Sequence, residues 1–161
     1  MDDKQHFESS ITSFKGVTSS KPIVQINPLN IRLRVLHVDD DLNQLMFTKL
    51  FLEEFNPDLT VESISVPSEA VQAIGSRNYD CIVSDYQMDE MDGIVLTRRV
   101  RELSNVPIII YTGRGSEEVE GVARAAGADG YVQKDIDPKH YFGLYEQIVS
   151  TVQCRLSKKY I

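Results

Sequence analysis

The pattern of apolar and polar positions along the chain switches repeatedly between strand-like runs and helical periodicity. Apolar or β-branched runs alternate five times with segments in which apolar residues recur every three or four positions. The pattern predicts strands over 32–38, 60–65, 80–84, 107–111 and 129–133, and helices over 42–55, 67–76, 93–103, 116–126 and 138–156. Such alternation is typical of a parallel sheet with right-handed crossover connections.

Capping signals support several of the predicted helices. Asp41 fits the N-cap of the first, and Pro67 fits the first turn of the second. Ser116, followed by two glutamates, opens the fourth, and Pro138 opens the fifth. The continuously apolar run 108–110 suits a strand that is buried on both faces. The sequence therefore predicts an α/β fold, a doubly wound five-stranded parallel sheet with helices on both faces.

The first predicted helix has no clean polar face. One apolar stripe, expected to face the core, consists of Leu42, Leu45, Met46 and Leu50, and a second consists of Phe47, Phe51 and Phe55. Two interpretations fit this pattern. Either the helix makes a broad core contact, or its phenylalanines lie under the N-terminal arm or in a dimer contact.

The first thirty residues differ from the rest of the chain. They are rich in serine and threonine, and their acidic and basic side chains balance. We predict a flexible, mostly disordered arm over 1–30 and one domain over 31–161. A short strand-like piece, 23–26, lies between two prolines and is a candidate to dock on the domain.

Charge and composition exclude several classes of protein. The net charge of −7 argues against a nucleic-acid surface, which normally needs a basic patch. The sequence has neither an apolar stretch long enough for membrane insertion nor a secretory h-region near its start. Cys81 and Cys154 are far apart and match no disulfide framework or zinc spacing, so we expect a cytoplasmic protein.

Candidate chemistry lies where four predicted strands end. One strand runs into Asp39, Asp40 and Asp41, and the others run into Asp85, Thr112 and Lys134. Because ligands bind beyond the carboxyl ends of strands in a parallel sheet, these side chains are expected to meet in one crevice. Carboxylates, a hydroxyl and an ammonium in one crevice can hold a divalent metal and receive a phosphoryl group.

Each of these residues alone has an ordinary explanation. Asp85 could be an acid that merely flanks a helix, and Asp41 only a helix cap, but capping hardly explains three consecutive acids. We assign Asp40 and Asp85 as direct Mg²⁺ ligands, with the backbone carbonyl of Gln87 as a third, and Asp39 as a ligand through water. Mn²⁺ or Ca²⁺ could substitute for Mg²⁺.

The remaining two side chains fit the phosphoryl oxygens. Lys134 supplies a positive charge, Thr112 can donate its hydroxyl, and Gly113 leaves room for the incoming group. Asp85 is then the candidate nucleophile, because carboxylates can form aspartyl-phosphate intermediates.

This ordered set resembles the receiver domain of two-component response regulators, the chemotaxis-type phosphoacceptor fold, over residues 32–156. The matching stretches are Val35-Leu36-His37-Val38-Asp39-Asp40-Asp41, Ile82-Val83-Ser84-Asp85-Tyr86-Gln87-Met88, Met91-Asp92-Gly93, Ile110-Tyr111-Thr112-Gly113 and Gly127-Ala128-Asp129-Gly130-Tyr131-Val132-Gln133-Lys134. The resemblance implies the flavodoxin-like strand order 2-1-3-4-5.

The resemblance also implies a switch. A sensor histidine kinase phosphorylates Asp85, Thr112 moves toward the phosphoryl group and Tyr131 turns inward. The surface formed by the predicted elements 116–126, 129–133 and 138–156 then changes for an unknown downstream protein. Self-dephosphorylation is expected, with Gln87 and Arg114 flanking the path of the water, but independent enzymatic turnover is not.

Two positions depart from the family pattern. Asp89 and Asp135 stand where prolines are common, so we expect a looser loop after Asp85 and a trans Lys134–Asp135 bond that aims Lys134 differently. His37 lies in a predicted central strand, and we interpret it as a packed, hydrogen-bonded core histidine rather than a phosphate donor.

The sequence therefore predicts a stand-alone receiver domain with a short arm, a kinase partner and a possible homodimer. One alternative is a receiver fragment of a larger hybrid kinase or regulator, and another is a pseudo-receiver that only binds partners. A third is an aspartate-nucleophile phosphohydrolase, which would carry a second acid where this chain has Gln87.

Overall fold

The computed structural model describes residues 31–159, in which strands and helices alternate as the sequence predicts. The elements are β1 (Leu33–Val38), α2 (Leu42–Phe55), β2 (Leu59–Ile64), α3 (Pro67–Ser76), β3 (Cys81–Ser84), α4 (Gly93–Leu103), β4 (Ile108–Thr112), α5 (Glu117–Ala126), β5 (Gly130–Gln133) and α6 (Lys139–Lys159). The predicted arm over 1–30, with its strand-like piece at 23–26, lies outside the described residues.

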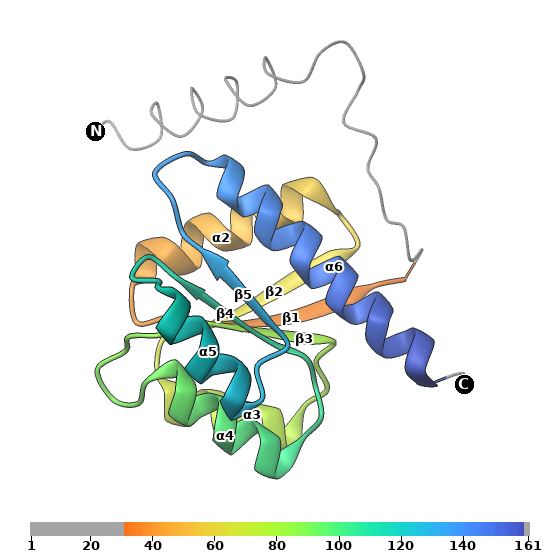
Figure 1. The fold of residues 1–161 in the computed structure, drawn as a ribbon. Helices are drawn as coiled ribbons and strands as arrows, with labels where there is room; N and C mark the ends of the chain where they lie inside the picture. The colour runs from red at the N-terminus through yellow and green to blue at the C-terminus, as the bar shows by residue number, and fades with distance from the viewer. Residues whose placement is uncertain (1–30, 160–161) are drawn as a thin grey trace.

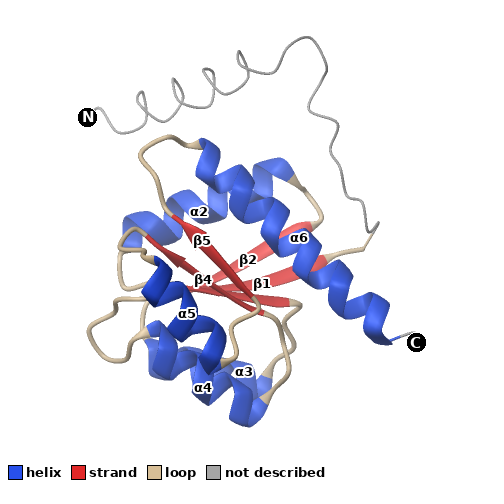
Figure 2. Cartoon of the chain, viewed as in Figure 1, coloured by secondary structure: helices blue, strands red, loops and turns tan. Residues whose placement is uncertain are grey.

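The five strands form one parallel sheet in the order β2-β1-β3-β4-β5, which confirms the predicted fold class and strand order. At the end of β1, Val38 is in register with Ile64 of β2 and Ser84 of β3. At the end of β4, Thr112 is in register with Gln133 of β5. The loops that carry the candidate residues therefore leave the same edge of the sheet (Figure 2).

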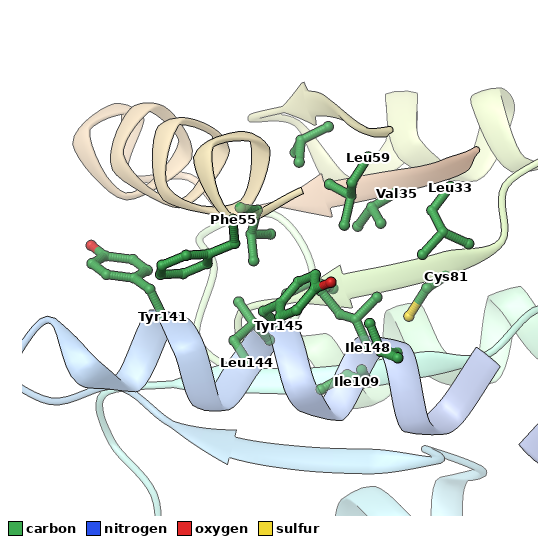
Figure 3. Packing of buried hydrophobic residues seen from close by; sticks show 14 of the residues in the cluster. Leu33, Val35, Phe55, Leu59, Cys81, Ile109, Tyr141, Leu144, Tyr145 and Ile148 are labelled. Atoms are coloured by element: carbon green, nitrogen blue, oxygen red, sulfur yellow. The ribbon is translucent and has the colours of Figure 1, made fainter. Parts of the chain in front are cut away.

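Helices cover both faces of the sheet, with α2 and α6 on one face and α3, α4 and α5 on the other (Figure 1). The buried core between the sheet and the α2/α6 pair includes Leu33, Val35, Phe51, Phe55, Tyr111, Tyr141, Leu144, Tyr145 and Ile148. Figure 3 shows part of this core, with the side chains of α6 reaching toward α2 and the strands. None of the helices within 31–159 is long and apolar enough to cross a membrane.

Local capping agrees with the sequence. The Asp41 carboxylate accepts hydrogen bonds from the backbone N–H groups of Asn43 and Gln44 at the start of α2. The Ser116 hydroxyl accepts one from Val119 at the start of α5, and Pro67 is the first residue of α3. The last helix runs three residues further than predicted, to Lys159.

The predicted orientation of the first helix is wrong for most of one stripe. Leu42, Met46 and Leu50 are exposed rather than part of the core, and only Leu45 of that stripe is buried. The phenylalanine stripe faces inward instead, with Phe51 and Phe55 buried and Phe47 partly buried. The Phe51 ring stacks on the ring of Tyr141 of α6 with 4.4 Å between the ring centroids, and the ring centroids of Phe55 and Tyr145 lie 5.9 Å apart. The helix α6 therefore covers Phe51 and Phe55, so neither the arm nor a dimer partner is needed to bury them.

Candidate functional site

Three carboxylates meet at the edge of the sheet where the strands end. Asp39 and Asp40 follow β1, Asp85 follows β3, and one oxygen from each lies within 4.8 Å of the others. Asp39 is 1% exposed and Asp85 is 9% exposed, whereas Asp40 faces solvent. The structure therefore brings together the acidic residues that the sequence singled out.

Backbone hydrogen bonds hold two of these acids, one to a neighbouring strand and one to the residue that caps the helix after β1. The N–H of Asp85 donates to the Val38 carbonyl at 2.9 Å, which ties the start of the loop after β3 to the end of β1. The N–H of Asp41 donates to Oδ1 of Asp39 at 2.9 Å, and this bond fixes the orientation of the Asp39 carboxylate. Asp39 and Asp85 are therefore held in place by backbone N–H groups just beyond the ends of β1 and β3.

Lys134 extends from the end of β5 into the same cluster. Its Nζ donates to Oδ2 of Asp39 at 2.6 Å and lies 3.4 Å from Oδ1 of Asp85. No cis peptide bond occurs between residues 31 and 159, so the Lys134–Asp135 bond is trans as expected. The side chain nevertheless reaches both carboxylates, so the trans bond does not turn Lys134 away from Asp85.

The electrostatics of the cluster favour a cation. Burial raises the pKa of Asp39, and the nearby Lys134 ammonium only partly opposes this effect. One ammonium faces three carboxylates, and clustered like charges repel unless another cation joins them. Oxygen ligands at this spacing suit a hard divalent ion such as Mg²⁺. The residues present therefore fit Mg²⁺, the ion expected from the sequence.

Thr112 and Tyr131 lie on the neighbouring strands. Thr112 ends β4, is 1% exposed, and its Oγ1 accepts a hydrogen bond from the backbone N–H of Arg114 at 3.2 Å. Tyr131 lies on β5, is half-buried and packs against the cluster that contains Ile110 and Ala123. A Cβ at Gly115 would lie 2.0 Å from the Tyr131 hydroxyl, so only glycine leaves room for this ring position.

The loop after Asp85 is tied at two points. The N–H of Gly93 donates to the Tyr86 carbonyl at 2.8 Å, and a Cβ at Gly93 would lie 2.2 Å from the Asp85 carbonyl oxygen. The N–H of Asp89 donates to Oδ2 of Asp40 at 3.1 Å, a bond that a proline could not make. Asp89 therefore tethers the loop that we expected it to loosen. Gln87 is exposed in this loop, and the metal-binding role of its carbonyl stays a prediction.

His37 is fully buried, as predicted for a core histidine. The expectation of a hydrogen bond is wrong, because neither ring nitrogen has a hydrogen-bond partner within 31–159. Burial, with a smaller contribution from Lys134, lowers the pKa of His37 to about 3. The ring is therefore neutral near pH 7, and its 4.0 Å approach to Asp39 is not an ion pair. Buried and neutral, His37 does not fit the role of an exposed phosphate donor.

Three further residues shape the site, although none of them was assigned a role in it from the sequence. Tyr111 lies against Lys134, Gly93 touches the backbone of Asp85, and Gly115 touches Tyr131. Glycines beside a candidate nucleophile loop and a candidate switch residue are a signal that could have been read as close approach. The contact of Tyr111 depends on the direction of the Lys134 side chain, which no pattern in the sequence specifies.

Comparison with known proteins agrees with this geometry. A family model described as "Response regulator receiver domain" matches residues 35–145. The uncharacterized transcriptional regulatory protein YclJ of Bacillus subtilis is 30% identical over 106 residues, which are 66% of this chain and 46% of that protein. The transcriptional regulatory protein SrrA of Staphylococcus aureus is 35% identical over 107 residues, 65% of this chain and 43% of that protein. The chain thus spans less than half the length of these curated relatives.

Solved structures show the same similarity. The receiver domain of a Francisella response regulator superposes with a TM-score of 0.68 at 29% identity, covering 76% of this chain and 98% of that one. A CheY-like receiver domain protein from Methanospirillum hungatei gives a TM-score of 0.67 at 26% identity, with the same coverage of both chains. Together with the sheet order and the family match, these comparisons show that the chain belongs to the response regulator receiver domain family.

Proposed function

We propose that this protein is a phosphoacceptor switch in which Asp85 accepts a phosphoryl group from a sensor histidine kinase. The observation that carries the proposal is the convergence of Asp39, Asp40, Asp85 and Lys134 at one edge of the sheet. Asp85 is 9% exposed at the end of a buried strand, so its carboxylate is both held in place and reachable. Family membership supports the same role.

The transfer makes one bond and breaks one. An oxygen of the Asp85 carboxylate attacks phosphorus and forms an acyl phosphate. The bond from phosphorus to the donor nitrogen of a phosphohistidine breaks, and the nitrogen keeps the electron pair. Lys134, 3.4 Å from Asp85, neutralises charge on one phosphoryl oxygen, and the Thr112 hydroxyl is the proposed donor to another. We expect no independent enzymatic turnover beyond loss of the phosphoryl group to water.

The acidic cluster would hold Mg²⁺, with Mn²⁺ or Ca²⁺ able to substitute. Asp40 and Asp85, with the backbone carbonyl of Gln87, are the proposed direct ligands, and Asp39 is the proposed ligand through water. When bound, the ion supplies positive charge for the phosphoryl oxygens. The protein supplies the fixed orientation of Asp39 through the Asp41 amide and of Asp40 through the Asp89 amide.

The proposed output is a change in the surface formed by α5, β5 and α6. Thr112 ends β4, and Tyr131 lies on the adjacent strand β5, which is part of this surface. A move of Thr112 toward the phosphoryl group would open space for Tyr131 to turn inward, which is a two-state response to a local charge. A downstream protein, or a second copy of this chain, would bind the altered surface.

The boundaries and context of the switch are also proposals. We propose 31–161 as the receiver domain and 1–30 as an appended arm. YclJ and SrrA are named as transcriptional regulators, but this chain matches less than half of each, and we propose protein contact rather than direct nucleic-acid binding as its output. A cytoplasmic location, expected from the two free cysteines, stays a prediction.

The test is phosphorylation of the whole chain without a kinase. The protein is incubated with acetyl phosphate and Mg²⁺, and its intact mass is followed. We expect one phosphoryl adduct that is absent with EDTA and absent in Asp85→Asn. The matched control is Asp58→Asn, which makes the same chemical change just before β2, at the end of the sheet where the strands begin. This variant should keep the adduct.

Other outcomes separate the alternatives. Absence of any adduct in the wild-type chain would contradict the proposal and favour a pseudo-receiver. Sustained turnover of phosphate esters would favour a phosphohydrolase. The exposed Gln87 argues against the hydrolase, because an amide cannot serve as the general acid that those enzymes place two residues after the nucleophile.

A further inference from the structure

The Tyr111 ring lies against the ammonium of Lys134. Nζ is 5.1 Å from the ring centroid, within the distance at which a cation is attracted by the face of an aromatic ring. Tyr111 is fully buried, and the Lys134 side chain is only 13% exposed. Little water can screen this contact, so it falls among the stronger examples of its kind.

Neighbours from two other elements fix the position of the ring. The centroid of Tyr111 lies 6.2 Å from that of His37 on β1 and 5.9 Å from that of His140, which belongs to α6. The ring also belongs to the apolar core between the sheet and the α2/α6 pair. Tyr111 is therefore a rigid surface, whereas Lys134 has a long flexible side chain that must be aimed.

The other contacts of Lys134 are those that the proposed chemistry would alter. Its partners Asp39 and Asp85 are a proposed metal ligand and the proposed phosphoacceptor, so their net charge differs between the free and phosphorylated states. The Tyr111 ring is uncharged and remains the same in both. The backbone of Lys134 is also tied next to it, because its N–H donates to the carbonyl of Thr112, the residue that follows Tyr111.

We propose that Tyr111 is a positioning residue that holds the Lys134 ammonium toward the phosphoryl group on Asp85. The inference rests on the proposed phosphoacceptor function and adds a residue to it. The part that matters is the ring face, since it is the face, not the hydroxyl, that lies against the Lys134 ammonium. Tyr111 acts through Lys134 and need not touch the phosphoryl group.

The test compares initial rates of adduct formation with acetyl phosphate and Mg²⁺ in the whole chain. Tyr111→Phe keeps the ring and should retain the wild-type rate. Tyr111→Leu removes the ring and should slow the reaction roughly thirtyfold, the effect expected for one desolvated cation–π contact. Tyr145→Leu is the matched control, because it makes the same change in the same core, near Phe55 and away from Lys134, and should keep the rate.

A double-mutant cycle separates positioning from general damage. In a Lys134→Met background, Tyr111→Leu should cause no further loss of rate, because the ammonium that it positions is gone. Equal losses in both backgrounds would overturn the proposal. If Tyr111→Leu does not fold, pentafluorophenylalanine at position 111 keeps the shape of a ring but reverses its quadrupole, and wild-type rates there would also overturn it.

The proposed function and the proposed role of Tyr111 are refuted by different results. A wild-type chain that forms no adduct would refute the proposed function. A wild-type chain that forms the adduct, together with a folded Tyr111→Leu variant of equal rate, would refute only the role of Tyr111.

Discussion

Substituting Gly93 tests how tightly the loop after Asp85 is constrained. A Cβ at this position would lie 2.2 Å from the Asp85 carbonyl oxygen and 3.1 Å from the Tyr86 Cα, both of which are backbone atoms that cannot rotate away. The loop would have to retreat by roughly 1 Å to reach ordinary contact. Gly93→Ala should therefore lower the free energy of unfolding by about 1–3 kcal/mol, the usual effect of overpacking.

The same shift should impair chemistry more than stability. Moving the backbone of Asp85 by roughly 1 Å displaces the proposed nucleophile, and misplacements of that size can lower rates on the order of a hundredfold. Unfolding in urea measures the loss of stability. The initial rate of adduct formation with acetyl phosphate and Mg²⁺ measures the loss of reactivity at Asp85. Both are measured on the whole chain.

The matched control for this experiment is Gly121→Ala in α5. A Cβ at Gly121 would have no neighbour within 4 Å, so this variant gains only helix propensity, about 0.5–1 kcal/mol, and keeps its rate. A Gly93→Ala protein with wild-type stability and wild-type rate would refute this prediction. It would mean that the chain accommodates the added Cβ without moving the backbone of Asp85.

Three further variants test contacts seen in the structure. Gly115→Ala should displace the Tyr131 ring, seen as a shift of its NMR resonances, and unchanged resonances would contradict the contact. Asp89→Pro removes the N–H that binds Asp40 and should weaken Mg²⁺ binding about threefold to tenfold by calorimetry, while Asp89→Asn should not. Arg101→Ala removes the hydrogen bonds that this α4 side chain donates to the carbonyls of Val106 and Gly127 and to the Asp129 carboxylate, just before β4 and β5. The variant should lower the free energy of unfolding in urea by about 2–3 kcal/mol, and wild-type stability would contradict this.

The fold could be predicted from the sequence because the apolar runs, the helical periodicity and the helix caps all indicated the same elements. Apolar runs such as Ile108–Ile110 have one structural solution in an alternating chain, a buried parallel strand covered by helices. Caps such as Asp41 and Ser116 then fixed where the helices begin. The strand order was not contained in these signals and came from resemblance to a family.

The orientation of α2 could not be predicted because two apolar stripes compete on it. Leu42 and Met46 fit a helical core stripe as well as Phe51 and Phe55 do. The choice was made by α6, whose Tyr141 and Tyr145 pack against the phenylalanines and leave the other stripe exposed. Such a preference depends on a partner helix about ninety residues away, which local periodicity does not report.

The candidate site was predictable in membership but not in contacts. The positions of Asp39, Asp85 and Lys134 at strand ends imply that they meet, since parallel strands share a carboxyl edge. Their pairing follows from side-chain directions, so neither the 2.6 Å contact of Lys134 with Asp39 nor the Asp89 tether could be inferred. Burial of Asp39 is equally a product of packing around the end of β1.

Burial of Asp39 should make the metal-free wild-type protein less stable near pH 7 than Asp39→Asn, which carries no charge at this position. Because burial raises the pKa of Asp39 above its usual value of 3.8, the folded state holds this proton more tightly than the unfolded state does. The stability from that proton is complete below pH 3.8 and is lost as pH rises through the raised pKa. Asp39→Asn keeps the shape but has no such loss, so its advantage over wild type should grow with pH over this range.

Divalent metal should make wild type more stable than Asp39→Asn, the reverse of their order without metal. This reversal would show that the charge of Asp39 serves metal binding. In EDTA at pH 7, Asp39→Asn should unfold at a higher urea concentration than wild type. Added Mg²⁺ stabilises whichever protein binds it in the folded state, so wild type should gain more than the variant. If wild type is already the more stable protein in EDTA, then Lys134 at 2.6 Å outweighs the penalty of burying Asp39, and the acidic cluster is not strained without a metal.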